Sequence, residues 1–152
     1  MAVYLVRHAK AGDREAWEQP DELRPLTKAG RRQADGLVGV LGDRSVERII
    51  SSPYVRCVQT VRPLARALGL PVEEDEALAE GADLGHILRL IEAAAAGNAV
   101  LCSHADVIEG TLLQVSRPSA GVETPLRLKK GSTWVLEADG GSLVVGRYLP
   151  PP

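Results

Sequence analysis

Residues 2–8 read AVYLVRH, a continuous apolar run that ends on an arginine and a histidine. A short apolar run without polar alternation is typical of a strand buried on both faces of a parallel sheet. Parallel strands need helical crossovers between them, so this strand predicts an α/β fold. It also places Arg7 and His8 at the carboxyl end of a central strand, where such sheets bind their ligands.

The rest of the chain alternates strand-length apolar runs with longer helical segments, which predicts a largely parallel sheet. The expected strands are residues 2–6, 46–50, 72–73 and 99–102, and the expected helices follow Thr27 to about Leu41, then 54–68, 84–96 and 106–115. Pro63 predicts a kink or a break in the second helix. Residues 133–137 and 143–148 flank Asp139-Gly140-Gly141 and predict a hairpin, hence an antiparallel edge strand. Residues 117–131 are expected to be mostly loop, and the three-proline tail is expected to fray.

Length and composition favour one ordinary globular domain, because 152 residues suffice for a single buried core. The net charge is −2 and aromatic residues make up 3% of the chain, so neither nucleic acid nor an anionic membrane is an expected partner. No apolar run approaches the roughly 20 residues that span a bilayer. Two cysteines without a CxxC pair, and an N-terminus unlike a secretory signal, predict a reduced, cytoplasmic protein.

Basic side chains follow three of the expected strands. Arg7 and His8 follow the first strand, Arg56 begins the helix after the second, and Ser103 and His104 follow residues 99–102. Because the carboxyl ends of parallel strands share one edge of a sheet, two histidines and two arginines are expected to meet there. These are the residue types of a phosphate pocket. The two-lysine pair at residues 129–130 could extend that site or simply be solvated.

The residues around these positions resemble those of a known family. The matching stretches are LVRHA at 5–9, RPLT at 24–27 with Gly30 and Gln33-Ala34, SSP at 51–53 with Arg56 and Gln59-Thr60, and Ser103-His104. In this order they are similar to the motifs of the histidine phosphatase (phosphoglycerate mutase-like) superfamily. The resemblance covers essentially the whole chain. It implies a three-layer α/β/α fold with a mostly parallel central sheet and an antiparallel edge strand, and a single histidine phosphatase domain over residues 1–152.

The resemblance also implies a mechanism. His8 attacks phosphorus and forms a phosphohistidine that water hydrolyses, while Arg7 and Arg56 bind the phosphoryl oxygens and His104, if protonated, adds a third positive charge. Neutral imidazole is a good nucleophile near pH 7. The scheme needs neither a metal nor a cofactor, and the sequence has no metal-ligand spacing.

A proton donor for the leaving group is implied by a further likeness. Leu78-Ala79-Glu80 resembles the acid motif of the family, which makes Glu80 the expected donor, although the acidic run before it is also typical of a solvated surface. Asp13 is the alternative. Ala9 and Ser103 replace glycines of the family pattern and are expected to narrow the pocket. Trp17 either covers the substrate or anchors its loop.

Two subfamilies resemble the chain, and they imply different substrates. The short length and the RPLT stretch are similar to SixA-type phosphohistidine phosphatases, whereas residues 11–17 and 21–24 are similar to the phosphatase domain of two-domain Nudix hydrolases. The first likeness implies a phosphohistidine protein or another small phosphorylated substrate, and the second a nucleotide or dinucleoside polyphosphate. A non-catalytic domain that binds a phosphorylated partner is a third alternative. The sequence does not distinguish a monomer from an oligomer.

Overall fold

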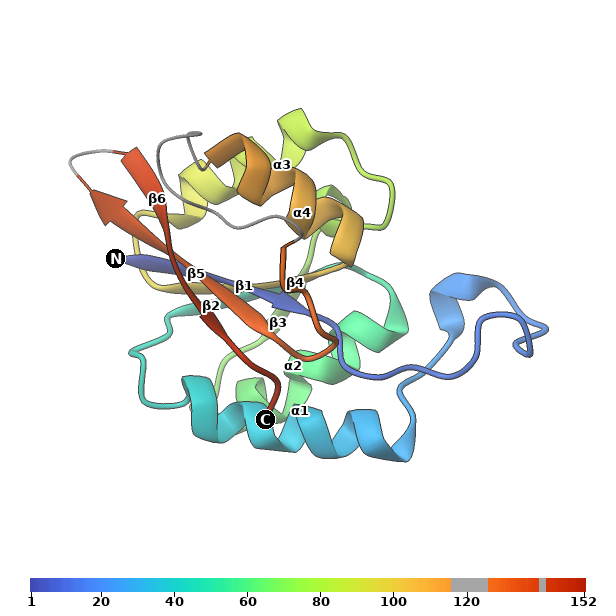
Figure 1. The fold of residues 1–152 in the computed structure, drawn as a ribbon. Coiled ribbons are helices and arrows are strands. Elements are labelled where there is room, and N and C mark those ends of the chain that lie inside the picture. The colour runs from blue at the N-terminus through green and yellow to red at the C-terminus, as the bar shows by residue number, and fades with distance from the viewer. Residues whose placement is uncertain (116–125, 140–141) are drawn as a thin grey trace.

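The structure is a computed structural model that describes residues 1–115, 126–139 and 142–152. Within them, one sheet is flanked by helices on both faces (Figure 1). The strands are β1 (Ala2–Arg7), β2 (Arg48–Ser51), β3 (Val72–Glu74), β4 (Ala99–Ser103), β5 (Thr133–Asp139) and β6 (Ser142–Leu149). The α-helices are α1 (Lys28–Leu41), α2 (Val55–Leu68), α3 (Leu84–Ala94) and α4 (Ala105–Val115), with 3₁₀ helices η1 (Asp21–Leu23) and η2 (Glu76–Leu78).

The sheet has the order β3-β2-β4-β1-β5-β6. Strands β1 to β4 pair in parallel, whereas β5 runs antiparallel to β1 and β6 antiparallel to β5. The carboxyl ends of β1, β2 and β4 therefore meet at one edge of the sheet, and the amino end of β5 arrives at the same edge. The residues that follow β1, β2 and β4 and those that precede β5 therefore lie at the same end of the sheet.

Two hydrophobic layers lie on opposite faces of the sheet. Val3 and Leu5 of β1 pack with the α3 and α4 side, while Tyr4 and Val6 pack with α1 and α2. Figure 1 shows α3 and α4 above the sheet and α1 and α2 below it. The alternation explains why residues 2–6 are apolar without a break, because successive side chains of a strand point to opposite faces. The predicted three-layer α/β/α architecture is confirmed.

Most expected elements are present with shifted ends. The strand predicted from Val46 begins at Arg48, the helix predicted to Ala96 ends at Ala94, and the short strand at residues 72–73 extends to Glu74. Thr27 caps α1, since its side chain accepts a hydrogen bond from the Gly30 N–H. Part of the loop predicted over residues 117–131 lies outside the described residues.

Of the two outcomes expected at Pro63, a kink or a break, the structure excludes the break, and the expected fraying of the C-terminal tail is wrong. Pro63 does not break α2, which runs from Val55 to Leu68 with the proline inside it. The buried face of α2 against the sheet holds the helix together across the missing N–H. The C-terminal tail does not fray, because Pro152 lies against α1 so closely that a methyl group on Gly36 would be 2.7 Å from its ring. No helix among the described residues is long and apolar enough to cross a membrane.

Candidate active site

The two histidines lie side by side at the carboxyl edge of the sheet. Arg7 ends β1 directly opposite Ser103, the last residue of β4. The backbone N–H of His8 then donates to the Ser103 carbonyl at 3.1 Å. This backbone contact brings the His8 and His104 rings together, with centroids 5.5 Å apart.

His8 is held as a neutral imidazole with one defined free nitrogen. Only 6% of the residue is exposed, and its Nδ1 lies 2.8 Å from the Ala9 carbonyl. A carbonyl can only accept, so Nδ1 carries the hydrogen and Nε2 is left with its lone pair. Burial lowers the pKa of His8 to about 3, and the positive charges of His104, Arg56 and Arg7 act in the same direction, against the raising effect of the Ala9 hydrogen bond. Near pH 7 the ring is therefore uncharged and nucleophilic.

His104 is fixed by groups from the segment after β2. It is 1% exposed, and its Nε2 lies 2.9 Å from the Ser52 hydroxyl and 3.6 Å from the Cys57 sulfur. The Tyr54 ring packs edge-on against it at 4.7 Å between centroids. The other ring nitrogen, Nδ1, is buried without a hydrogen-bond partner among the described residues. His104 is thus rigidly placed with one nitrogen unused.

Arg56 is fully buried and is already engaged by a carboxylate. Its Nη1 donates to the Asp21 backbone carbonyl at 2.8 Å, and its Nη2 lies 3.0 Å from the Asp21 carboxylate. Burial alone would raise the pKa of Asp21, but the hydrogen bonds from Arg24 and Arg56 outweigh it and hold that pKa below its usual value. The guanidinium also lies 4.9 Å from the Tyr54 ring centroid. Both terminal nitrogens of Arg56 therefore contact Asp21.

Arg7 has no carboxylate partner among the described residues. One of its terminal nitrogens donates to the Leu128 carbonyl, while its Nε is buried without a partner. Burial lowers the pKa of Arg7. Arg56 Nε is unpartnered as well. His104 Nδ1 is likewise buried without a partner among the described residues, although an unmade buried hydrogen bond costs about 1–3 kcal/mol. A small oxyanion is the kind of ligand that offers acceptors to such groups.

A cavity of about 580 Å³ opens beside the histidines. It is lined by Arg7, His8, Ala11, Gly12, Asp13, Arg14, Arg24, Glu80, His104, Ala105, Asp106 and Lys130. Sites for drug-sized ligands measure roughly 300–1,000 Å³, so this cavity accepts more than one phosphoryl group. Arg56 is not among the lining residues.

Both candidate proton donors line this cavity. Glu80 follows η2, whose Leu78 carbonyl accepts a 2.6 Å hydrogen bond from Ser103 Oγ. Its carboxylate lies 2.9 Å from Arg14 and 3.6 Å from Arg56. Asp13 accepts a hydrogen bond from the Glu15 backbone N–H at 3.0 Å.

The remaining motif residues support the chain around the site. A Cβ on Gly30 would lie 1.9 Å from the Lys10 carbonyl, so only glycine fits there. Gln33 accepts from the Lys10 N–H and donates to the Lys130 carbonyl. Gln59 accepts from the Leu26 N–H, and Thr60 accepts from the Ala9 N–H. These residues hold the segment after β1 against α1 and α2.

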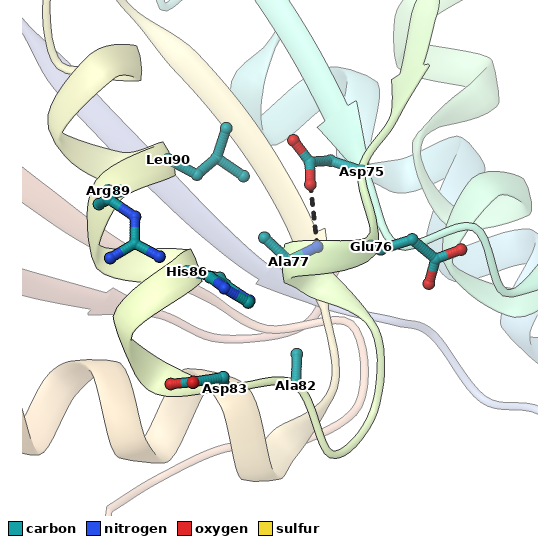
Figure 2. Close-up of a pocket in the computed structure, with 8 residues that line it drawn as sticks. All are labelled: Asp75, Glu76, Ala77, Ala82, Asp83, His86, Arg89 and Leu90. Carbon is teal, nitrogen blue, oxygen red and sulfur yellow. Dashed lines mark hydrogen bonds between the residues drawn. The ribbon is translucent and has the colours of Figure 1, made fainter.

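Several side chains lie away from the cavity. Neither Ala9 nor Ser103 lines it, so the expected narrowing is wrong: Ala9 packs with Leu26 and Ala34, and Ser103 binds the Leu78 carbonyl. Trp17 is not in the lining either, and its ring N–H donates to the Pro20 carbonyl within its own loop. His86 projects from α3 into a separate hollow beside η2 (Figure 2), which shares no lining residue with the first.

Several polar neighbours of the site were not predicted from the sequence. Asp21, Ser52, Arg14 and Arg24 received no role, although Asp21 and Ser52 contact Arg56 and His104 directly. The SSP motif contained a signal for Ser52, but nothing in the local sequence marks Asp21, which reaches Arg56 across 35 residues. Among the described residues, no group of three or more His, Cys, Asp and Glu side chains could hold a metal ion.

Comparisons with known proteins agree on the class of protein, phosphatases. Residues 3–87 match the family described as the histidine phosphatase superfamily (branch 1). The chain is 38% identical, over 99% of its length, to 8-oxo-(d)GTP phosphatase from Mycolicibacterium smegmatis, and it spans about half (48%) of that protein. It resembles the structure of the protein histidine phosphatase SixA complexed with tungstate, with 22% identity, a TM-score of 0.84, and coverage of 99% of this chain and 97% of that one.

A second solved structure has slightly higher identity. The putative phosphohistidine phosphatase SixA from Agrobacterium tumefaciens is 28% identical with a TM-score of 0.83, and the match covers 99% of this chain and 98% of that one. All three of these relatives are named as phosphatases, which is the enzyme class expected from the sequence.

Proposed function

Because this chain belongs to the histidine phosphatase superfamily, we propose that it is a phosphatase that works through a phosphohistidine on His8. The observation that carries the proposal is the state of His8: a buried, neutral ring whose Nδ1–H is bound to the Ala9 carbonyl and whose Nε2 has no hydrogen-bond partner among the described residues. A ring fixed in this tautomer presents its lone pair without first losing a proton.

In the proposed reaction, His8 Nε2 attacks phosphorus while the bond to the leaving group breaks. Water then attacks the phosphohistidine, releases phosphate and restores the ring. The charge on the phosphoryl oxygens is balanced by Arg7, by the buried Arg56 and by His104, whose unpartnered nitrogens would gain acceptors. Ser52 positions His104 through the 2.9 Å hydrogen bond.

Glu80 is the proposed proton donor for the leaving group, with Asp13 as the alternative. Both line the cavity, so either can face a bound substrate. Glu80 first has to give up its 2.9 Å contact with Arg14, an exposed side chain that can move away at little cost. A phosphohistidine substrate would demand less of this acid, because its leaving imidazole needs less help than an alkoxide.

Residues 1–152 form one histidine phosphatase domain in this proposal. Two substrate classes remain for it. The likeness to SixA structures supports a phosphohistidine protein. The 38% identity to a protein named 8-oxo-(d)GTP phosphatase supports a nucleotide or dinucleoside polyphosphate instead. The two buried free cysteines, Cys57 and Cys102, suit a reducing compartment such as the cytoplasm.

The test is hydrolysis of an aryl phosphate in the presence of EDTA by the wild type, His8→Ala and His86→Ala. We expect His8→Ala to lose activity by a factor of about 10⁴ or more, since the nucleophile is removed. The control variant His86→Ala changes a histidine of the separate hollow and should keep the wild-type rate. Acid-labile phosphate should be trapped on the wild type and absent from His8→Ala.

Equal rates for the wild type and His8→Ala would instead favour a non-catalytic domain that binds a phosphorylated partner. Loss of activity on chelation, restored by one metal, would contradict the metal-free mechanism. Rates on a phosphohistidine protein, a nucleoside diphosphate and a sugar phosphate, measured side by side, decide between the substrate classes.

A further inference from the structure

Lys130 is a basic residue that lines the cavity and has no role in the proposed mechanism. It lines the same cavity as Arg7 and His8, whereas its neighbour Lys129 does not. It has no ion pair or side-chain hydrogen bond among the described residues. Burial, and then the charges of Arg7, Arg24, Lys10 and Arg14, lower its pKa, although Asp13, Glu80 and Asp106 also line the cavity.

The backbone holds Lys130 in this place. The N–H of Gly131 donates to the carbonyls of both Arg7 and His8, each at 3.1 Å. The Lys130 carbonyl accepts from Gln33 Nε2 at 3.1 Å. Gly131 has φ = 85°, a backbone conformation that favours glycine, so the turn requires glycine at this position. The turn is therefore tied to the strand end that carries the nucleophile.

An unpaired lysine held among like charges is unfavourable for folding, and a bound anion would remove the repulsion. Arg7 and His104 line the cavity, and each has a buried nitrogen without a partner among the described residues, so they can bind one phosphoryl group. The cavity, at about 580 Å³, has room beyond it. The arginines on that side are less available, because Arg24 binds Asp21 and the Gly12 carbonyl, and Arg14 binds Glu80. Lys130 is the cation left over for a second anionic group.

We propose that Lys130 binds a second phosphate of the substrate, adjacent to the phosphoryl group that His8 accepts, and so makes the site selective for diphosphate esters over monophosphates. This inference rests on the proposed function. In the reaction the terminal phosphoryl group moves to His8, the bridging P–O bond breaks, and the monophosphate leaves with the bridging oxygen. Water then releases phosphate from His8, so one diphosphate and one water give one monophosphate and one phosphate.

The binding test uses probes that cannot be hydrolysed: methylphosphonate, with one anionic phosphorus, and methylenediphosphonate, with two. Calorimetry on the wild type should show methylenediphosphonate binding about tenfold more tightly, as expected for one added charge-assisted contact. Lys130→Met should abolish this preference. Lys130→Arg should retain most of it, and Lys129→Met, the matched control outside the cavity, should retain all of it.

The kinetic test compares AMP with ADP, which differ only in the second phosphate. Lys130→Met should lower the ratio of kcat/KM for ADP to that for AMP about tenfold, mainly through KM. An unchanged ratio in Lys130→Met, or a wild type that binds the two phosphonates equally, overturns the inference even if phosphatase activity is present. A full phosphonate preference in a chain that hydrolyses no phosphate supports the anion site and rejects the proposed function.

Discussion

The inner pocket and the rim of the cavity are built in different ways. The inner pocket, with Arg7, His8, Arg56 and His104, comes from strand ends and the helix that follows β2. His8, Arg56 and His104 are buried, and Arg7 is half-buried. The rim, with Arg14 and Glu80, is formed by loop residues joined by partly exposed ion pairs. Charges in the inner pocket are shielded from water and interact strongly, whereas those on the rim are screened. The inner pocket should therefore carry the chemistry, and the rim should adjust what binds.

Among the changes that compare the inner pocket with the rim, removing the buried guanidinium is expected to have the largest effect. Arg56→Met should lower kcat by a factor of about 10²–10³, because a charge that stabilises the transition state is lost. It should also lower the free energy of unfolding by about 2–3 kcal/mol, since Asp21 loses its buried partner but stays partly solvated.

The control for this variant is Arg48→Met. Arg48 makes a comparable 2.8 Å ion pair with Glu73, but on the surface. Loss of this ion pair should change the free energy of unfolding by less than about 1 kcal/mol and leave kcat unchanged. Similar losses in both variants would remove the distinction between buried and exposed charge. Urea unfolding and steady-state kinetics measure both quantities.

A smaller effect is expected from the pH dependence of stability. His8 takes up a proton near pH 6.5 when unfolded but only near pH 3 when folded, because burial lowers its pKa. Between these values the unfolded chain binds more protons, so this group makes stability rise with pH from about 3 to 6.5 and leaves it flat above.

The difference between wild type and His8→Asn isolates this contribution. The wild type should lose about 1.6 kcal/mol more than the variant between pH 6.5 and pH 5, because the unfolded histidine is half protonated at the first pH and almost fully protonated at the second. Urea unfolding at both pH values provides the measurement. Parallel losses in the two proteins would mean that His8 is protonated readily in the folded state.

The smallest effect is expected at the rim. Arg14 is 60% exposed, and its partner Glu80 is 33% exposed. Arg14→Met should change the free energy of unfolding by less than about 1 kcal/mol, and added salt should reduce the difference further. A loss comparable to that of Arg56→Met would show that the rim contributes to the folded core.

Much of the fold could be predicted from local sequence. The apolar run at residues 2–6, the Thr27 cap and the hairpin at 133–148 each have a local cause, and all are present. A break at Pro63 is excluded, since packing of α2 on the sheet outweighs the local cost of a proline. The resemblance to the histidine phosphatase superfamily is confirmed by the family match over residues 3–87.

The residues of the site could be predicted from local sequence only in part. Asking which residues follow each parallel strand found Arg7, His8 and His104, because the parallel direction puts these ends at one edge. It left open whether the lysine pair at residues 129–130 belongs to the site, because Lys130 precedes β5 and follows no parallel strand. Strand β5 runs antiparallel to β1, so its amino end reaches the same edge of the sheet.

The sequence by itself determined the family, the layered fold and the edge of the sheet at which the histidines lie, since periodicity and motif order are properties of short segments. Only the tertiary structure decided that Asp21 occupies the Arg56 fork, that Ser52 holds His104, and that Lys130 stands unpaired beside His8. Such contacts join residues 35, 52 and 122 positions apart in the chain, and no local pattern encodes which distant side chains will meet.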